Sequence, residues 1–131
     1  MRRVLLFVVG AALSATSVAY AHHSYAATYD TSKEVKLDGK LVQFVYRNPH
    51  SFVHLEVADD KGVPQRWAIE WSGGGQLANQ GVQRDSLKVG DEVVILGRPS
   101  RVPGEFRALM VTLKRPADGF TWGNRTGQAV E

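Results

Sequence analysis

The four histidines of this chain carry its clearest chemistry, and they fall into two short clusters. His22 and His23 follow Ala21, while His50 and His54 lie further along the chain. Imidazole is the commonest transition-metal ligand in proteins near neutral pH. The clusters therefore raise the hypothesis of a metal site, and the spacing of the histidines decides which of them could share one ion.

The first 21 residues have the composition of a secretory signal peptide. Arg2 and Arg3 form a positive start, an apolar run over 4–13 follows, and residues 19–21 (AYA) offer a cleavage site of small residues. The apolar run is shorter than the roughly 20 residues that cross a bilayer. We therefore expect cleavage after Ala21, export to the periplasm and no stable membrane span in the processed protein.

Cleavage at this point would make His22 the first residue, with a free α-amine. The amine and the imidazole of His22 can chelate Cu(II) together, because Cu(II) favours nitrogen ligands in square arrangements. His23 adds a second imidazole, and a remote histidine would complete the site. The alternative is a polar chain start without metal, since termini are often mobile. A shift of the cleavage point by one residue would remove the amine chelate.

Strand geometry separates the two histidines of the second cluster. His50 and His54 are four positions apart, which is about 13 Å along a regular strand at about 3.3 Å per residue. They cannot bind one ion together unless the chain bends between them. We expect His50 to meet the N-terminal arm, either as a metal ligand or as a turn residue. We expect His54 to face Glu70 as an exposed cross-strand pair.

Charge and cysteine content exclude several classes of protein. Loss of residues 1–21 removes two of the 16 basic residues and no acidic one, so 14 basic residues remain against 13 acidic ones, a net charge of +1. Such a balance argues against nucleic-acid binding, which needs clustered cations. The chain has no cysteine, which excludes disulfides and thiolate metal ligands. No catalytic triad is identifiable among its serines, so we expect no enzyme.

Alternating apolar residues predict an all-β domain with one small helix. The predicted strands cover about 34–46, 51–58, 65–71, 92–96 and 106–113, with the helix at 76–79. A helix between the third and fourth of five strands is typical of an OB-like barrel. A small β-sandwich is the alternative.

The second and third strands are predicted to form a hairpin in which Val57 faces Trp67. This register brings the apolar faces of both strands together, and a slip by one residue would bury the wrong side. It leaves Phe52, His54 and Glu70 on the outer face. These residues would form a surface for another protein or an oligosaccharide if no metal is bound.

The rest of the chain divides simply. The 110 residues that remain after cleavage suffice for one small domain. We expect a short N-terminal arm at 22–33, held to the domain by Tyr25 and Tyr29, then the barrel at 34–115. The Gly-rich, polar residues 116–131 predict a flexible C-terminal tail.

Four segments resemble one family. AHHSYAATYD after the signal peptide, NPHSFVHLEV, WAIEW and RDSLKVGDEVVILGRPSR are similar to short exported bacterial proteins of unknown function. The resemblance runs from His22 to about Leu113, and the HHS start combined with the NPH segment is its specific part. It implies an exported β-domain of OB-like form and no particular activity.

The sequence thus predicts a non-catalytic periplasmic binding protein. The expected metal ligands are His22, His23 and His50, with copper as the expected ion. The alternative is a metal-independent interaction module, whose partner would be a periplasmic protein or a small ligand.

Overall fold

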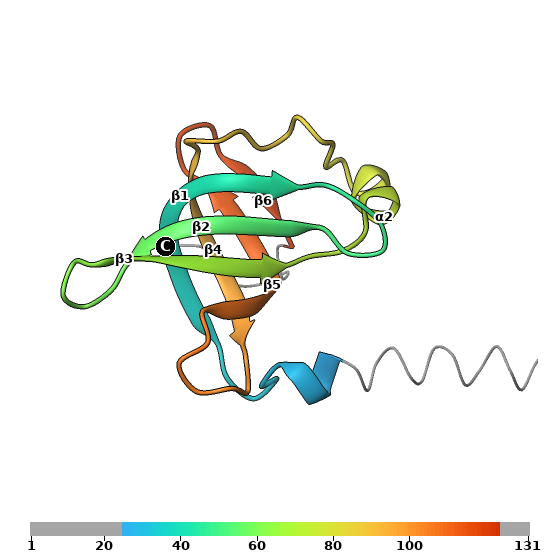
Figure 1. Cartoon of the computed structure of the whole chain (residues 1–131). Helices are drawn as coiled ribbons and strands as arrows, with labels where there is room; N and C mark the ends of the chain where they lie inside the picture. The colour runs from blue at the N-terminus through green and yellow to red at the C-terminus, as the bar shows by residue number, and fades with distance from the viewer. Residues whose placement is uncertain (1–24, 124–131) are drawn as a thin grey trace, which may run out of the picture.

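Six strands, a helical turn at 25–28 and the short helix α2 lie within residues 25–123, the part of the chain that the computed structural model describes (Figure 1). In chain order the elements are β1 (Val35–Val45), β2 (Phe52–Ala58), β3 (Pro64–Glu70), α2 (Gly74–Asn79), β4 (Glu92–Pro99), β5 (Arg107–Arg115) and β6 (Phe120–Trp122).

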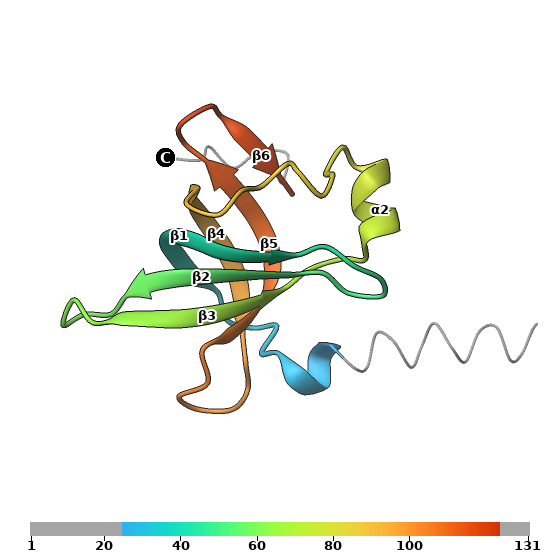
Figure 2. The same cartoon turned by 45° about the horizontal axis from the view of Figure 1, so that its top comes forward.

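The first five strands close into a barrel. The strand order is β3-β2-β1-β4-β5, with antiparallel neighbours, and β5 returns to pair with β3 in parallel from Ala68–Arg107 to Glu70–Leu109. Figure 2 shows α2 at one end of this barrel, on the connection from β3 to β4. The predicted OB-like barrel is therefore confirmed, and the sandwich alternative is not the fold.

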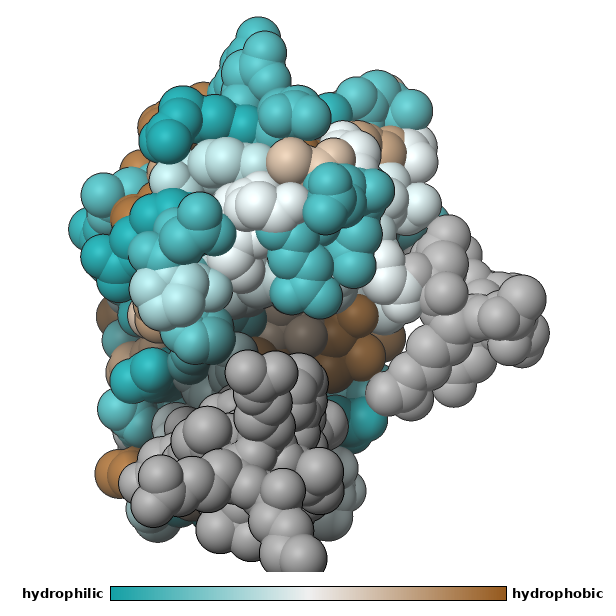
Figure 3. Space-filling view, turned by 90° about the vertical axis from the view of Figure 1, so that its right-hand side faces the viewer, coloured by the Kyte–Doolittle hydropathy of each residue, from teal (hydrophilic) through white to brown (hydrophobic). Residues whose placement is uncertain are grey.

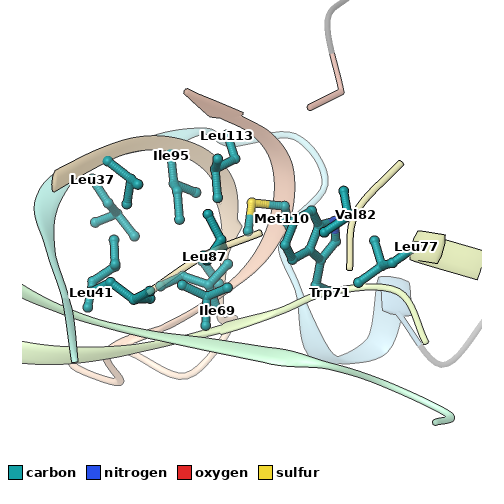
Figure 4. Close-up of a cluster of buried hydrophobic side chains, with 14 residues drawn as sticks. Leu37, Leu41, Ile69, Trp71, Leu77, Val82, Leu87, Ile95, Met110 and Leu113 are labelled. Atoms are coloured by element: carbon teal, nitrogen blue, oxygen red, sulfur yellow. The ribbon is translucent and has the colours of Figure 1, made fainter. Parts of the chain in front are cut away.

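Inward-pointing side chains from all five barrel strands fill the interior with apolar atoms. Figure 4 shows this cluster, to which α2 and the segment after it add Leu77, Val82 and Leu87. Leu41, Leu55 and Ile95 are completely buried. Burial of each such side chain stabilises the fold by about 1.5–3 kcal/mol, so the barrel can hold together without disulfides.

A β-bulge in β1 explains why the core residues of this strand occupy odd positions in its first part and an even position after Val42. The pairing with β2 shifts between Leu41 and Gln43, so Val42 is the extra residue. Before the bulge Leu37 and Leu41 point into the core, and after it Phe44 packs there. A bulge reverses the alternation of a strand in this way.

The observed register of the β2–β3 hairpin differs from the predicted register by two residues. Val57 pairs with Gln65 rather than Trp67, and His54 pairs with Ala68 rather than Glu70. The cause is the turn: Oδ1 of Asp59 accepts hydrogen bonds from the backbone of the turn that follows it, at 2.9 Å. This tight turn closes the hairpin early, although the inward faces of both strands are as predicted.

The segment after residue 115 also differs from the prediction. Residues 116–119 form a turn, and β6 pairs with the end of β5 from Leu113–Trp122 to Arg115–Phe120. Arg115 holds this turn through its ion pair with Asp118, at 2.8 Å. The predicted flexible tail is therefore wrong for 116–123, and residues 124–131 lie outside the described part.

Candidate functional site

The N-terminal arm is fixed to the outside of the barrel by backbone and side-chain contacts. Residues 25–28 are helical, and Tyr29 forms an isolated β-bridge with Ser100. The amide of Asp30 donates to the carbonyl of Pro99 at 2.9 Å. The guanidinium Nε of Arg101 donates to the carbonyl of Ala26. The arm therefore has a defined position beside the loop that joins β4 and β5.

Tyr29 closes a buried polar cluster at this position. Its side chain is fully buried, and its hydroxyl donates to Oε2 of Glu70. Arg107 donates from Nε to the Tyr29 hydroxyl at 2.9 Å and from Nη2 to Oε2 of Glu70 at 3.0 Å. Burial and the hydrogen bond to Glu70 raise the pKa of Tyr29 well above its ordinary value. The phenol therefore stays protonated at any physiological pH.

Tyr25 and His50 extend this cluster towards solvent. The hydroxyl of Tyr25 lies 2.8 Å from Nδ1 of His50, and the same nitrogen lies 3.6 Å from Oε1 of Glu70. Burial, and secondarily the charge of Glu70, raises the pKa of Tyr25. Within residues 25–123, both polar contacts of the imidazole use Nδ1, so no described residue occupies Nε2.

His50 lies in a hydrogen-bonded turn between β1 and β2. The Asn48–Pro49 peptide bond is cis, and the buried hydroxyl of Ser51 both accepts from the amide of Arg47 and donates to its carbonyl. Gly73 lies so close to this turn that a Cβ there would be 2.6 Å from the carbonyl oxygen of Pro49. The Gly-rich segment after β3 is thus required for close packing.

A cavity of about 290 Å³ opens beside His50. Figure 3 views the side of the molecule that carries α2 and shows a hollow with an apolar floor on this face. Ring-bearing residues line the cavity together with polar groups of the segment that enters α2. Its wall consists of Tyr25, Pro49, His50, Trp71, Ser72, Gly73, Gln76, Leu109, Met110 and Trp122.

The residues predicted as an outer surface share one face of β2 and β3, with Phe52 opposite Glu70 in the register, but Glu70 is not exposed there. Phe52 and His54 are half-buried on β2, with ring centroids 6.4 Å apart in a stacked arrangement. Glu70 is only 8% exposed, because the arm covers it. Burial, then the charge of Arg66, lowers the pKa of His54. The expected His54–Glu70 pair is therefore wrong, and Glu70 belongs to the cluster with Tyr29.

Only one of the three predicted metal ligands lies in the part of the chain that the structure describes. His22 and His23 lie outside it, and His50 lies within it. Among residues 25–123, no group of three or more histidine, aspartate or glutamate side chains is placed to share an ion. A site of three protein ligands around His50 would therefore need donors from residues beyond this range.

Two residues of the polar cluster were not predicted as site residues. Arg107 comes from β5 and meets Glu70 because β5 lies parallel to β3, a long-range pairing that no local pattern reveals. The fully buried Tyr29 was expected only as an anchor of the arm. A usable signal was present there, since Tyr25 and Tyr29 are four residues apart in an otherwise polar segment.

The family model described as "Family of unknown function (DUF6152)" matches residues 11–107. No curated protein matches the chain significantly. Among solved structures, the crystal structure of a mitochondrial single-stranded DNA binding protein from S. cerevisiae, Rim1, is similar with a TM-score of 0.47 and 8% identity. That match covers 63% of this chain and 91% of the other. No helix within residues 25–123 has the length and apolar character needed to cross a membrane.

Proposed function

The chain belongs to DUF6152, a family of unknown function, and from its candidate site we propose that it is a non-catalytic binding protein for a transition-metal ion. The proposed ion is copper, and the proposed ligands are His50 and the N-terminal His22 and His23. The proposal includes export to the periplasm after cleavage behind Ala21, because the amine of His22 is one of the ligands.

The observation that carries the proposal is the way His50 is held. Metal-binding histidines usually bind through one ring nitrogen, while the other contacts a carboxylate or another polar group that fixes the ring. Nδ1 of His50 lies 2.8 Å from the Tyr25 hydroxyl and 3.6 Å from the Glu70 carboxylate. A metal on Nε2 requires the tautomer with a proton on Nδ1, and the Tyr25 hydroxyl can accept that proton, with the Glu70 carboxylate nearby.

The position of Tyr25 supports the proposed ligand set, because His22 and His23 are close to it in sequence. Tyr25 is in direct contact with His50, with ring centroids 5.7 Å apart. His23 and His22 precede Tyr25 by two and three residues, and an extended chain spans at most about 3.6 Å per residue. Both histidines are therefore tethered within about 11 Å of the Tyr25 Cα, which allows them to join the His50 imidazole around one ion.

The donor set favours copper over the other common ions. An amine and imidazoles are nitrogen ligands, and Cu(II) binds such ligands most strongly among the divalent first-row metals. Magnesium and calcium prefer carboxylate and carbonyl oxygens. Glu70 does not compete as a ligand, because its Oε2 already accepts from Tyr29 and Arg107 and its Oε1 faces Nδ1 of His50, the nitrogen away from the proposed metal.

Mass spectrometry of the protein secreted from its own signal tests this proposal. The intact mass should correspond to a chain that begins at His22, and the native mass should increase by one copper ion after equimolar Cu(II) is added. A mature chain with a different first residue would overturn the amine chelate. A correctly processed chain that takes up no copper would overturn the function.

A further inference from the structure

Arginine and aromatic side chains form a row on the outer face of β2 and β3 and of the turn that follows β1. Figure 1 shows β1, β2 and β3 side by side in front of β4 and β5. Arg47 follows β1, Phe52 and His54 lie on β2, and Arg66 lies on β3. We call these four residues the outer row. None of them belongs to the buried core cluster.

Neighbouring groups hold the two guanidinium groups of the outer row in place. That of Arg47 lies 5.6 Å from the centroid of the Phe52 ring, and its Nε donates to the carbonyl of His50 at 3.2 Å. Nη2 of Arg66 donates to Oε1 of Gln43 at 3.0 Å, a contact that crosses β2. Each guanidinium has five donors, so most of the donors remain available on each.

The outer row has an excess of positive charge. Within residues 25–123, neither Arg47 nor Arg66 forms an ion pair. Glu70 is on the same side of β3 but is buried and paired with Arg107. Glu56 is exposed and lies opposite Arg66 in the β2–β3 register, without an ion pair to it. Charge complementarity therefore favours an anionic partner.

We propose that the outer row binds a linear acidic oligosaccharide, with its carboxylates on Arg47 and Arg66. The planar guanidinium group matches the two oxygens of a carboxylate. The half-buried rings of Phe52 and His54 stack on β2 between the two arginines, and the guanidinium groups of Arg47 and Arg107 lie 5.6 and 5.8 Å from the centroid of the Phe52 ring. The face of an aromatic ring carries partial negative charge, so the C–H groups of a saturated sugar ring can lie against the exposed part of these rings.

The number of charges favours an acidic sugar over a nucleic acid. A single-stranded nucleic acid carries one phosphate per nucleotide, and proteins follow it with a continuous basic groove and stacked bases. The outer row offers two unpaired guanidinium groups and has the Glu56 carboxylate beside one of them. A chain with widely spaced carboxylates satisfies these two groups without leaving other charges unpaired.

Isothermal titration with a hyaluronan tetramer, which carries a carboxylate on every second sugar and so offers two carboxylates to the two arginines, tests the proposal. We expect binding at low salt that weakens as NaCl is raised, since exposed charges are screened. Arg66→Gln and Arg47→Gln should each weaken the affinity roughly three- to tenfold. Arg84→Gln is the matched control, because this guanidinium also lies over a ring, that of Tyr46, at 5.2 Å, and Tyr46 packs against the core and is not part of the outer row. It should bind like the unmodified protein.

Three outcomes would overturn the assignment to an acidic oligosaccharide. These are no binding of the tetramer, equal binding of a neutral tetramer of glucose, and tighter binding of a single-stranded oligonucleotide. The titration is repeated with a chelator, which removes any metal from His50. Binding that persists in chelator separates this surface from the proposed metal site, so each proposal can fail alone.

Discussion

The hydroxyl of Tyr25 lies 2.8 Å from Nδ1 of His50, and this contact joins the N-terminal arm to the turn between β1 and β2. The carboxylate of Glu70 lies 3.6 Å from the same nitrogen. One ring nitrogen therefore has a hydrogen-bond partner and a nearby carboxylate, which is the arrangement expected of a histidine that binds metal through its other nitrogen. The arm both fixes His50 and carries the remaining proposed ligands.

Tyr29→Phe should destabilise the protein by about 1.5–3 kcal/mol, because it removes a buried hydrogen bond to a charged carboxylate. The hydroxyl of Tyr29 donates to Glu70 and accepts from Arg107 at 2.9 Å. Urea denaturation at pH 7 measures the loss. Tyr25→Phe is the control and should cost less than about 1 kcal/mol, since the contact is only partly buried. Equal losses would contradict the buried role of Tyr29.

Trp71→Phe should cost much less than Trp71→Ala. Trp71 is 2% exposed, and its indole N–H has no hydrogen-bond partner in the described part of the chain. Phenylalanine keeps most of the ring packing and removes an unsatisfied donor whose burial costs about 1–3 kcal/mol. We expect a loss below about 2 kcal/mol for Phe and about 3–5 kcal/mol for Ala. Thermal unfolding of the two variants side by side provides the comparison, and similar losses would show that the N–H has a partner.

Asp118→Asn should lower the melting temperature at pH 7 and leave it almost unchanged at pH 2. Hydrogen bonds from Arg115, at 2.9 and 2.8 Å, lower the pKa of Asp118 to about 2 from an ordinary 3.8. A carboxyl with a lowered folded-state pKa stabilises the fold above its unfolded-state pKa, and this is lost as pH falls through the folded-state value. The difference should therefore vanish between about pH 4 and pH 2. Asp85→Asn, at an exposed carboxylate that forms no ion pair within residues 25–123, is the control and should change the melting temperature little.

The fold was largely predictable because its pattern is local. Alternation of apolar residues located the five barrel strands, and the short helix between β3 and β4 indicated the OB-like order. The register of the hairpin was wrong because Asp59 closes the turn through its own side chain. The tail was misjudged because Gly-rich composition hid the ion pair between Arg115 and Asp118, which orders the turn before β6.

The site was predictable only where it depends on residue type. His50 and the arm were expected to meet, and Tyr25 makes that contact. The partner of Glu70 could not be predicted, since Arg107 reaches it through the parallel pairing that closes the barrel. Tyr29, Arg107 and His50 meet around the Glu70 carboxylate because of the topology of the barrel. The spacing of residues along the sequence does not reveal such contacts.

Titration of the processed protein with Cu(II), followed by isothermal calorimetry, tests the central claim most directly. We expect one ion per chain, with affinity reduced at least about tenfold by His50→Ala, by His22→Ala and by one added residue before His22. His54→Ala is the matched control and should bind like the unmodified protein, because its ring stacks with Phe52 on β2. Unchanged copper affinity in the His50→Ala variant would contradict the account.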